Sequence, residues 1–230
     1  MHLDLLSGGA AKGLVDAMQP AFTASTGCAV RATFSAVGAM QQKLLAGEPC
    51  DVVILTAALL DALTRDGHVV AETVIALGAV PTGVAVRRGD DRPDVSDGDA
   101  LRATLLTASA IYVPDTERST AGIHVMKVLH LLGIDAEVAA RLHTYPNGAT
   151  AMLELSGANE HRPIGITQVS EIIATPGVDL AGVLPTGFEL ATVYSAAVTT
   201  RAREGALARR FVQLLASADA AAARVRAGFQ

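Results

Sequence analysis

Three short loops of small and hydroxyl-bearing residues are the part of this sequence best suited to bind a ligand. They read Ser7-Gly8-Gly9-Ala10, Ser35-Ala36-Val37-Gly38 and Thr56-Ala57-Ala58, and each stands between an apolar run and a helical pattern. Such a loop leaves backbone N–H groups unpaired at the start of the next helix, where the helix dipole is positive. The loops therefore predict a site for a small anion such as a carboxylate or an oxyanion.

Alternating strands and helices position these loops. Apolar runs predict strands over residues 3–6, 28–34 and 51–55, with helices over 11–25, 37–46 and after Thr56. This alternation is typical of a parallel sheet covered by helices on both faces, whose ligands lie at the carboxyl ends of the strands. Ser and Thr are also ordinary N-cap residues, which explains any one loop. Three loops at one sheet edge favour a polar binding cleft.

The remaining residues predict a second α/β lobe. A long strand over residues 75–88 contains Pro81-Thr82-Gly83, where we expect strand pairing to break because proline donates no backbone hydrogen bond. A late strand over 191–199 returns the chain. We therefore expect lobe I over residues 1–80 plus 196–230 and lobe II over 84–190, with crossings near 81–83 and 191–196. Further helices are predicted over 97–106, 123–132, 202–216 and 219–227, and further strands over 110–113, 164–167 and 179–184.

Composition excludes several classes of partner. Half of the residues are hydrophobic, 18% are charged, and the net charge is −5. A surface for nucleic acid or anionic membrane would need a clustered basic patch. No uncharged stretch is longer than residues 73–86, which is too short to insert into a membrane. Because no signal peptide is visible, we expect a cytoplasmic protein as the sequence is written, or a periplasmic one if a leader has been removed.

Other catalytic and metal-binding patterns are missing. The sequence has no Ser–His–Asp arrangement with a nucleophile elbow, no His–Glu metal spacing and no phosphate-binding loop. We therefore expect neither a metal nor a cofactor. Cys28 and Cys50 each precede a predicted strand, and we expect two reduced, buried thiols.

The order of elements resembles the type II periplasmic binding proteins, most closely the molybdate-binding proteins of ABC transporters. The resemblance covers nearly the whole chain. Its more specific matches are Gly47-Glu48-Pro49-Cys50-Asp51-Val52 and the terminal helix pair from Leu215 to Phe229. Commoner matches are the loop at 7–10, Phe34-Ser35-Ala36-Val37-Gly38, Ala121-Gly122-Ile123 and Gly165-Ile166-Thr167.

This resemblance implies two α/β lobes, each a mostly parallel sheet flanked by helices, joined by two crossing strands and closing on a small anion. It places Ser7 to Ala11, Ser35, Ala121 and the helix start at Gly148-Ala149 beside the anion. Around these we add Ala36, Thr56 and Thr120 as ligand-binding candidates, and Arg118, which could hold a carboxylate bidentately. The small anion is the expected partner, and a transporter permease is a further partner only if the protein is exported.

Two positions depart from the molybdate-binding pattern. Where those proteins place a tyrosine after the Gly-Ile-Val strand, this sequence has Gln168, and the first loop leads into Lys12 where uncharged residues are usual. An amide and an ammonium suit a carboxylate at least as well as a metal oxyanion. The ligand remains open between an organic di- or tricarboxylate and a tetrahedral oxyanion.

An enzyme of the aconitate isomerase type is the alternative, because the Ser-Gly-Gly loop and Gln168-Val169-Ser170-Glu171 resemble that branch of the fold. An allylic proton shift on an unsaturated carboxylic acid needs a positioned base and electrostatic support for negative charge, and no cofactor. Candidate catalytic residues are Lys12, His124 and Glu171. The simpler reading of each is a solvated lysine, a surface histidine and a complement to a helix dipole.

Overall fold

The computed structural model describes every residue from Met1 to Gln230, and the chain divides into two compact units. Unit 1 comprises Met1–Val80 and Val193–Gln230, and unit 2 comprises Pro81–Thr192. The chain passes from one unit to the other within two strands, β4 (Ile75–Arg87) and β9 (Ala191–Val198). The sequence analysis expected crossings near residues 81–83 and 191–196.

Unit 1 is a mixed sheet with helices on both faces. Strands β1 (His2–Gly8), β2 (Ala29–Ser35) and β3 (Val52–Thr56) are parallel in the order β2-β1-β3, and β9 adds an antiparallel partner to β3. Its helices are α1 (Lys12–Thr26), α2 (Val37–Leu45), α3 (Ala57–Arg65), α9 (Gly205–Ala216) and α10 (Ala221–Arg226), with short 3₁₀ turns at Gly9–Ala11 and Ala71–Thr73.

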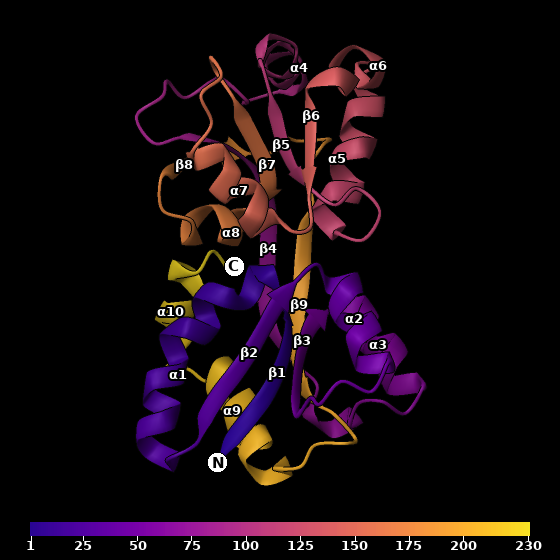
Figure 1. Cartoon of the computed structure of the whole chain (residues 1–230), viewed down its shortest axis with the longest axis vertical. Helices are drawn as coiled ribbons and strands as arrows, with labels where there is room; N and C mark the ends of the chain where they lie inside the picture. The colour runs from indigo at the N-terminus through magenta and orange to yellow at the C-terminus, as the bar shows by residue number, and fades with distance from the viewer. The chain divides into compact units, whose positions relative to one another are not determined.

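The helices of unit 1 form two layers. In Figure 1, α1, α9 and α10 lie on one side of its sheet, and α2 and α3 lie on the other. Phe22 of α1 meets Phe211 of α9 edge to face, with ring centroids 4.9 Å apart. Leu5 and Ile54 of the central strands are fully buried, as expected for parallel strands covered on both faces.

Unit 2 repeats the architecture with more antiparallel pairing than expected. Strand β5 (Ile111–Pro114) pairs in parallel with β6 (Leu142–Tyr145) and β7 (Ile164–Gln168), whereas β4 pairs antiparallel with β7 and β8 (Val178–Val183). Its helices are α4 (Gly98–Thr107), α5 (Thr120–Leu131), α6 (Asp135–Val138), α7 (Gly148–Ser156) and α8 (Val169–Ala174), with a 3₁₀ turn at Ala139–Arg141.

Alternate residues of β4 and β5 belong to two apolar clusters on opposite faces of this sheet. Val84 and Ile111 belong to the cluster that α4 and α5 cover, whereas Ala85 and Tyr112 belong to the cluster that α7 covers. Successive strand residues point to opposite faces, so each face receives its own set.

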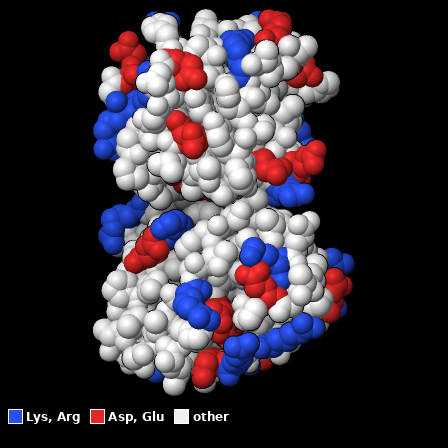
Figure 2. All heavy atoms as spheres, viewed as in Figure 1, with Lys and Arg blue, Asp and Glu red and all other residues white.

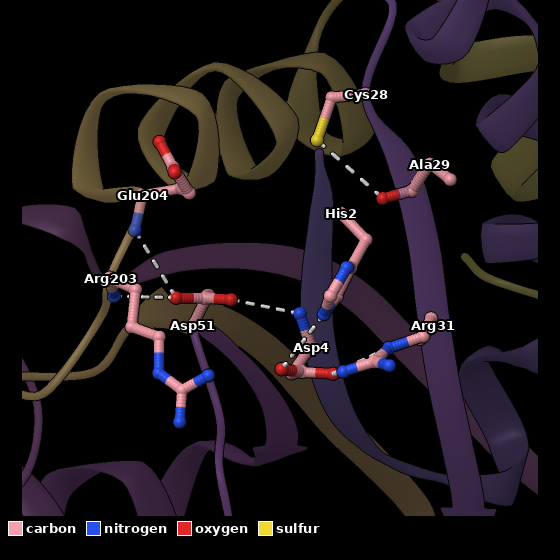
Figure 3. Close-up of polar contacts among 8 residues, drawn as sticks. All are labelled: His2, Asp4, Cys28, Ala29, Arg31, Asp51, Arg203 and Glu204. Atoms are coloured by element: carbon pink, nitrogen blue, oxygen red, sulfur yellow. Dashed lines mark hydrogen bonds and ion pairs between the residues drawn. The ribbon is translucent and has the colours of Figure 1, made fainter.

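Asp51, the acidic residue of the Gly-x-Pro-x-Asp-Val segment, is a buried structural anchor (Figure 3). Its carboxylate accepts hydrogen bonds from the backbone N–H of Asp4 at 2.8 Å and of Arg203 at 2.7 Å. The Asp4 carboxylate in turn accepts a hydrogen bond from Nη2 of Arg31 at 2.7 Å. The segment thus ties β1 to the chain that enters α9, which gives it a role in the fold.

The structure corrects two sequence expectations. Strand β4 continues through Pro81, because Thr82 and Gly83 pair with Gln168 and Thr167 of β7. Strand β6 and the short helix α6 were not expected. Cys28 and Cys50 are both free and buried, as predicted, and burial raises the pKa of the Cys50 thiol to about 12.

Charged side chains of both signs are interspersed on the face shown in Figure 2, without a large patch of Lys and Arg. None of the helices is long and apolar enough to cross a membrane.

Candidate functional site

The predicted anion-binding loops of unit 1 begin at the carboxyl ends of three neighbouring strands, β1, β2 and β3. Gly8 is the register partner of Ser35, and Ser7 is the partner of Ile54, two residues before Thr56. Neighbouring strands lie about 4.8 Å apart, so the three loops share one short stretch of sheet edge. The structure therefore brings together seven sequence-predicted residues: Ser7, Gly8, Gly9, Ala10, Ser35, Ala36 and Thr56.

Close packing explains why the first loop contains Gly8. A Cβ at this position would lie 2.7 Å from Cγ1 of Val37 and 3.2 Å from Cε1 of Tyr194. Both distances are shorter than ordinary van der Waals contact. The backbone of Gly8 therefore lies directly against the start of α2 and the ring of Tyr194, and Gly9 to Ala11 turn the chain into α1.

The three hydroxyl groups of this edge differ in their partners. The Ser7 hydroxyl, which is fully buried, donates to the carbonyl oxygen of Gly8 at 2.9 Å. Thr56 is the N-cap of α3 and accepts from the N–H of Leu59 at 3.4 Å. Ser35 is half-buried at the end of β2, one residue before the N-cap of α2. Ser7 and Thr56 thus serve the fold locally, and Ser35 is the side chain whose binding role we test below.

Lys12 opens α1 and lies on its accessible side. Its ammonium forms an ion pair with Asp16 one turn further along the helix. The Nζ atom of Lys12 lies 5.6 Å from the ring centre of Phe34. Phe34 immediately precedes Ser35 at the end of β2. Lys12 therefore stands near the carboxyl edge of the sheet as a positive charge that already has a carboxylate partner.

In unit 2, the side chain of Glu171, a residue of α8, lies against the start of α7. Its buried carboxylate accepts a hydrogen bond from the Thr167 hydroxyl at 2.6 Å. Burial raises the pKa of Glu171, and hydrogen bonds from Thr167 and from the backbone N–H groups of Ala149, Gln168 and Gly148 oppose that rise. A carboxylate in this position complements the N-terminus of α7 from within the protein.

This arrangement bears on two sequence-predicted residues. The resemblance implies that the N–H groups at Gly148 face the ligand, but the structure places Glu171 against them. A Cβ on Gly148 would overlap Oε2 of Glu171 and Oγ1 of Thr167. The Thr167 hydroxyl and three backbone N–H groups hold the Glu171 carboxyl group against the start of α7, so the structure favours a positioning role for it.

Thr120 and Ala121 are the first two residues of α5. The two charged candidates near them, Arg118 and His124, make contacts within the protein. Arg118 is exposed, in a turn where its backbone N–H donates to Oδ1 of Asp115 at 2.9 Å. Nε2 of His124 lies 2.8 Å from the carbonyl oxygen of Phe188, so this nitrogen is committed to a backbone contact. His124 thereby joins α5 to the chain before β9.

Gln168 ends β7 as the N-cap of α8, and its side chain is buried. Nε2 donates to Oγ1 of Thr192 at 3.2 Å, while Oε1 has no hydrogen-bond partner. Two more buried hydroxyls lack a partner, those of Thr82 and Ser170. The sequence analysis singled out neither hydroxyl, since Thr82 lies in the predicted strand break and Ser170 lies within the Gln168-Val169-Ser170-Glu171 segment.

Comparisons with known proteins identify the family. The family model described as bacterial extracellular solute-binding protein matches residues 3–230. This chain belongs to that family. It is 30% identical over 227 residues to an aconitate isomerase from Pseudomonas sp, covering 96% of this chain and 84% of the relative. The family confirms the resemblance drawn from the sequence.

Two solved structures of other binding proteins share the fold. The periplasmic molybdate-binding protein of Azotobacter vinelandii superimposes with a TM-score of 0.82 at 19% identity, covering 99% of this chain and 98% of that one. The sulfate-binding protein SubI of Mycobacterium tuberculosis H37Rv gives 0.78 at 20% identity, covering 100% and 86%. The expected type II periplasmic-binding-protein fold is thus confirmed.

Proposed function

We propose that this solute-binding protein captures a small anion, an organic di- or tricarboxylate or a tetrahedral oxyanion, at the carboxyl edge of the unit 1 sheet. The observation that carries the proposal is the register of Gly8 beside Ser35, with Thr56 on the next strand. Three helices begin at this edge, and their N-terminal N–H groups favour negative charge.

Carboxylates rank ahead of metal oxyanions in this proposal. Lys12 near the edge supplies a charge-assisted donor, and the amide of Gln168 stands where molybdate-binding proteins usually place a tyrosine. The relative at 30% identity is named for a tricarboxylic acid, whereas the proteins named for molybdate and sulfate are no more than 20% identical. The chemistry and the similarity therefore support the same ranking.

A thermal-shift screen tests this function directly. Molybdate, tungstate, sulfate and a series of di- and tricarboxylates are each added to the purified protein. A ligand at about 100 times its Kd adds roughly 2.7 kcal/mol to the free energy of unfolding, which is readily detected. We expect the largest shift from a carboxylate. Failure of every anion in the screen would refute the proposal.

Ser35→Ala then tests the edge itself. Loss of one hydroxyl that bonds the ligand weakens binding by about 0.5–1.5 kcal/mol, to be measured by titration calorimetry. Ser25→Ala is the matched control, because its hydroxyl donates to the carbonyl of Phe22 at the far end of α1. An unchanged Kd in Ser35→Ala would assign that serine to the fold alone.

The second candidate function is isomerisation of an unsaturated carboxylic acid. The observation in its favour is the 30% identity to an aconitate isomerase over nearly the whole chain. The reaction moves one proton between carbons, so incubation with cis- and trans-aconitate followed by NMR detects it without a coupled assay. Appearance of the other isomer above the rate without protein supports catalysis. Binding without interconversion would leave solute capture as the function.

A further inference from the structure

Three buried oxygen atoms at the carboxyl end of β7 lack a hydrogen-bond partner. They are Oγ1 of Thr82, Oε1 of Gln168 and Oγ of Ser170, on side chains that are 1%, 3% and 3% exposed. Buried side-chain polar groups nearly always have a partner, and an unmet one costs about 1–3 kcal/mol. Unmet groups at a carboxyl edge, where α/β proteins bind ligands, point to a ligand.

The fold places these groups together. Thr82 and Gln168 are direct register partners in the antiparallel pairing of β4 and β7, so their side chains share one face with Cβ atoms about 5 Å apart. Ser170 follows two residues later, in the first turn of α8. Thr82 is held firmly, because its N–H donates to Leu190 and its carbonyl accepts from Leu184.

The chemistry of Gln168 defines what this set can recognise. Its Nε2 donates one of its two N–H groups to Oγ1 of Thr192, whereas Oε1, an atom that only accepts hydrogen bonds, has no partner. A fully ionised carboxylate or a tetrahedral dianion offers acceptors alone and cannot satisfy Oε1. A hydroxyl group satisfies it, and the hydroxyls of Thr82 and Ser170 can donate to a neighbouring carboxylate oxygen.

We propose that Thr82, Gln168 and Ser170 form a subsite for an α- or β-hydroxy carboxylate, with the ligand hydroxyl donating to Oε1 of Gln168. The inference rests on the proposed anion-binding function and narrows it to a ligand class. It also assigns binding roles to Thr82 and Ser170.

The test compares acids that differ by one hydroxyl. Malate is paired with succinate, and citrate with propane-1,2,3-tricarboxylate, at a pH where every carboxyl group is ionised. We expect the hydroxylated member of each pair to bind about tenfold more tightly, as one added hydrogen bond allows. Equal affinities within both pairs would overturn the proposal, and so would tighter binding of the member without a hydroxyl. If none of the four acids binds but an oxyanion does, the hydroxy-acid subsite fails while anion capture stands; no binding by any anion overturns both.

Variants separate a ligand role from a structural one. Thr82→Val and Ser170→Ala remove hydroxyls that have no partner in the protein, so we expect the midpoint of urea unfolding to stay equal or rise. The preference for malate over succinate should fall at least threefold in each. Thr167→Val is the matched control, since Thr167 bonds Glu171 and its loss should lower the midpoint. An undiminished malate preference in both test variants would refute the subsite.

Discussion

The hydroxyl of Thr167 donates a 2.6 Å hydrogen bond to Oε2 of Glu171, four residues further along the chain. Thr167 is the second-last residue of β7, and Glu171 lies in the first turn of α8. Together with the N–H groups at the start of α7, this contact makes Glu171 the common partner of two helix starts. The Glu171 side chain thus links two helix starts in the segment that the family resemblance associates with ligand binding.

The ionisation of Glu171 should be detectable in the pH dependence of the free energy of unfolding. Burial raises the folded-state pKa of Glu171 above its ordinary value of 4.5. A raised pKa means that the folded protein binds the proton more tightly, so this contribution to stability is full below pH 4.5 and is lost as pH rises through the folded-state pKa. The difference in unfolding free energy between the natural protein and Glu171→Gln should therefore decrease from pH 4.5 upward.

Urea unfolding at several pH values measures this difference. Glu154→Gln is the control, because Glu154 is exposed on α7 and keeps the same charge change. Its difference from the natural protein should stay flat over the same range. A Glu171→Gln curve parallel to that of the natural protein would contradict the assignment.

Gly148→Ala should disrupt the contact of Glu171 with Thr167 and the start of α7 by steric overlap. The added Cβ meets Oε2 of Glu171 and Oγ1 of Thr167, so the carboxylate or the helix start must move. Overpacking of this kind costs about 1–3 kcal/mol, measured as a lower midpoint of urea unfolding. Gly157→Ala at the other end of α7 is the control, because the nearest atom to its Cβ is 3.9 Å away. Equal stability of the two variants would argue against close packing at Gly148.

Gly8→Ala should weaken anion binding through the packing of the first loop. The new Cβ lies 2.7 Å from Cγ1 of Val37, so the loop and the start of α2 must separate. We expect a lower affinity for the anion and a modest loss of stability. Val37→Ala removes that Cγ1, so the double variant should recover most of the loss. Calorimetric titration of both variants gives the comparison, and the absence of recovery would place the effect of Gly8 elsewhere.

Local patterns predicted the architecture, and long-range contacts account for what they missed. The loops after β1, β2 and β3 were readable because each follows an apolar run and opens a helical pattern. Proline chemistry predicted a break at Pro81, but β4 continues because its pairing partner is β7, which lies more than eighty residues away in sequence. The contact of Glu171 with the start of α7 could not be predicted from the sequence either, since it depends on α7 and α8 meeting in space.

The candidate site divides in the same way. Ser7, Gly8, Ser35 and Thr56 follow from strand order alone, and the structure places them on one edge. The partners of His124 and Lys12 depend on side-chain direction, which spacing does not define. Thr82 carried no signal in sequence beyond a hydroxyl between Pro81 and Gly83, because only its burial and its missing partner draw attention to it.

Lys12→Ala provides the test between capture and catalysis. The Lys12–Asp16 pair is exposed, so its loss changes stability by no more than about 1 kcal/mol. If the protein isomerises aconitate, the ammonium supports the negative charge that develops as the proton leaves, an interaction stronger in the transition state than in the bound substrate. Turnover should then fall by about 10²-fold or more, with a much smaller change in Kd. Lys43→Ala is the matched control, because Lys43 is similarly exposed and is paired with Glu48. Equal turnover in the two variants would exclude Lys12 from the chemistry, and a loss confined to binding would favour solute capture.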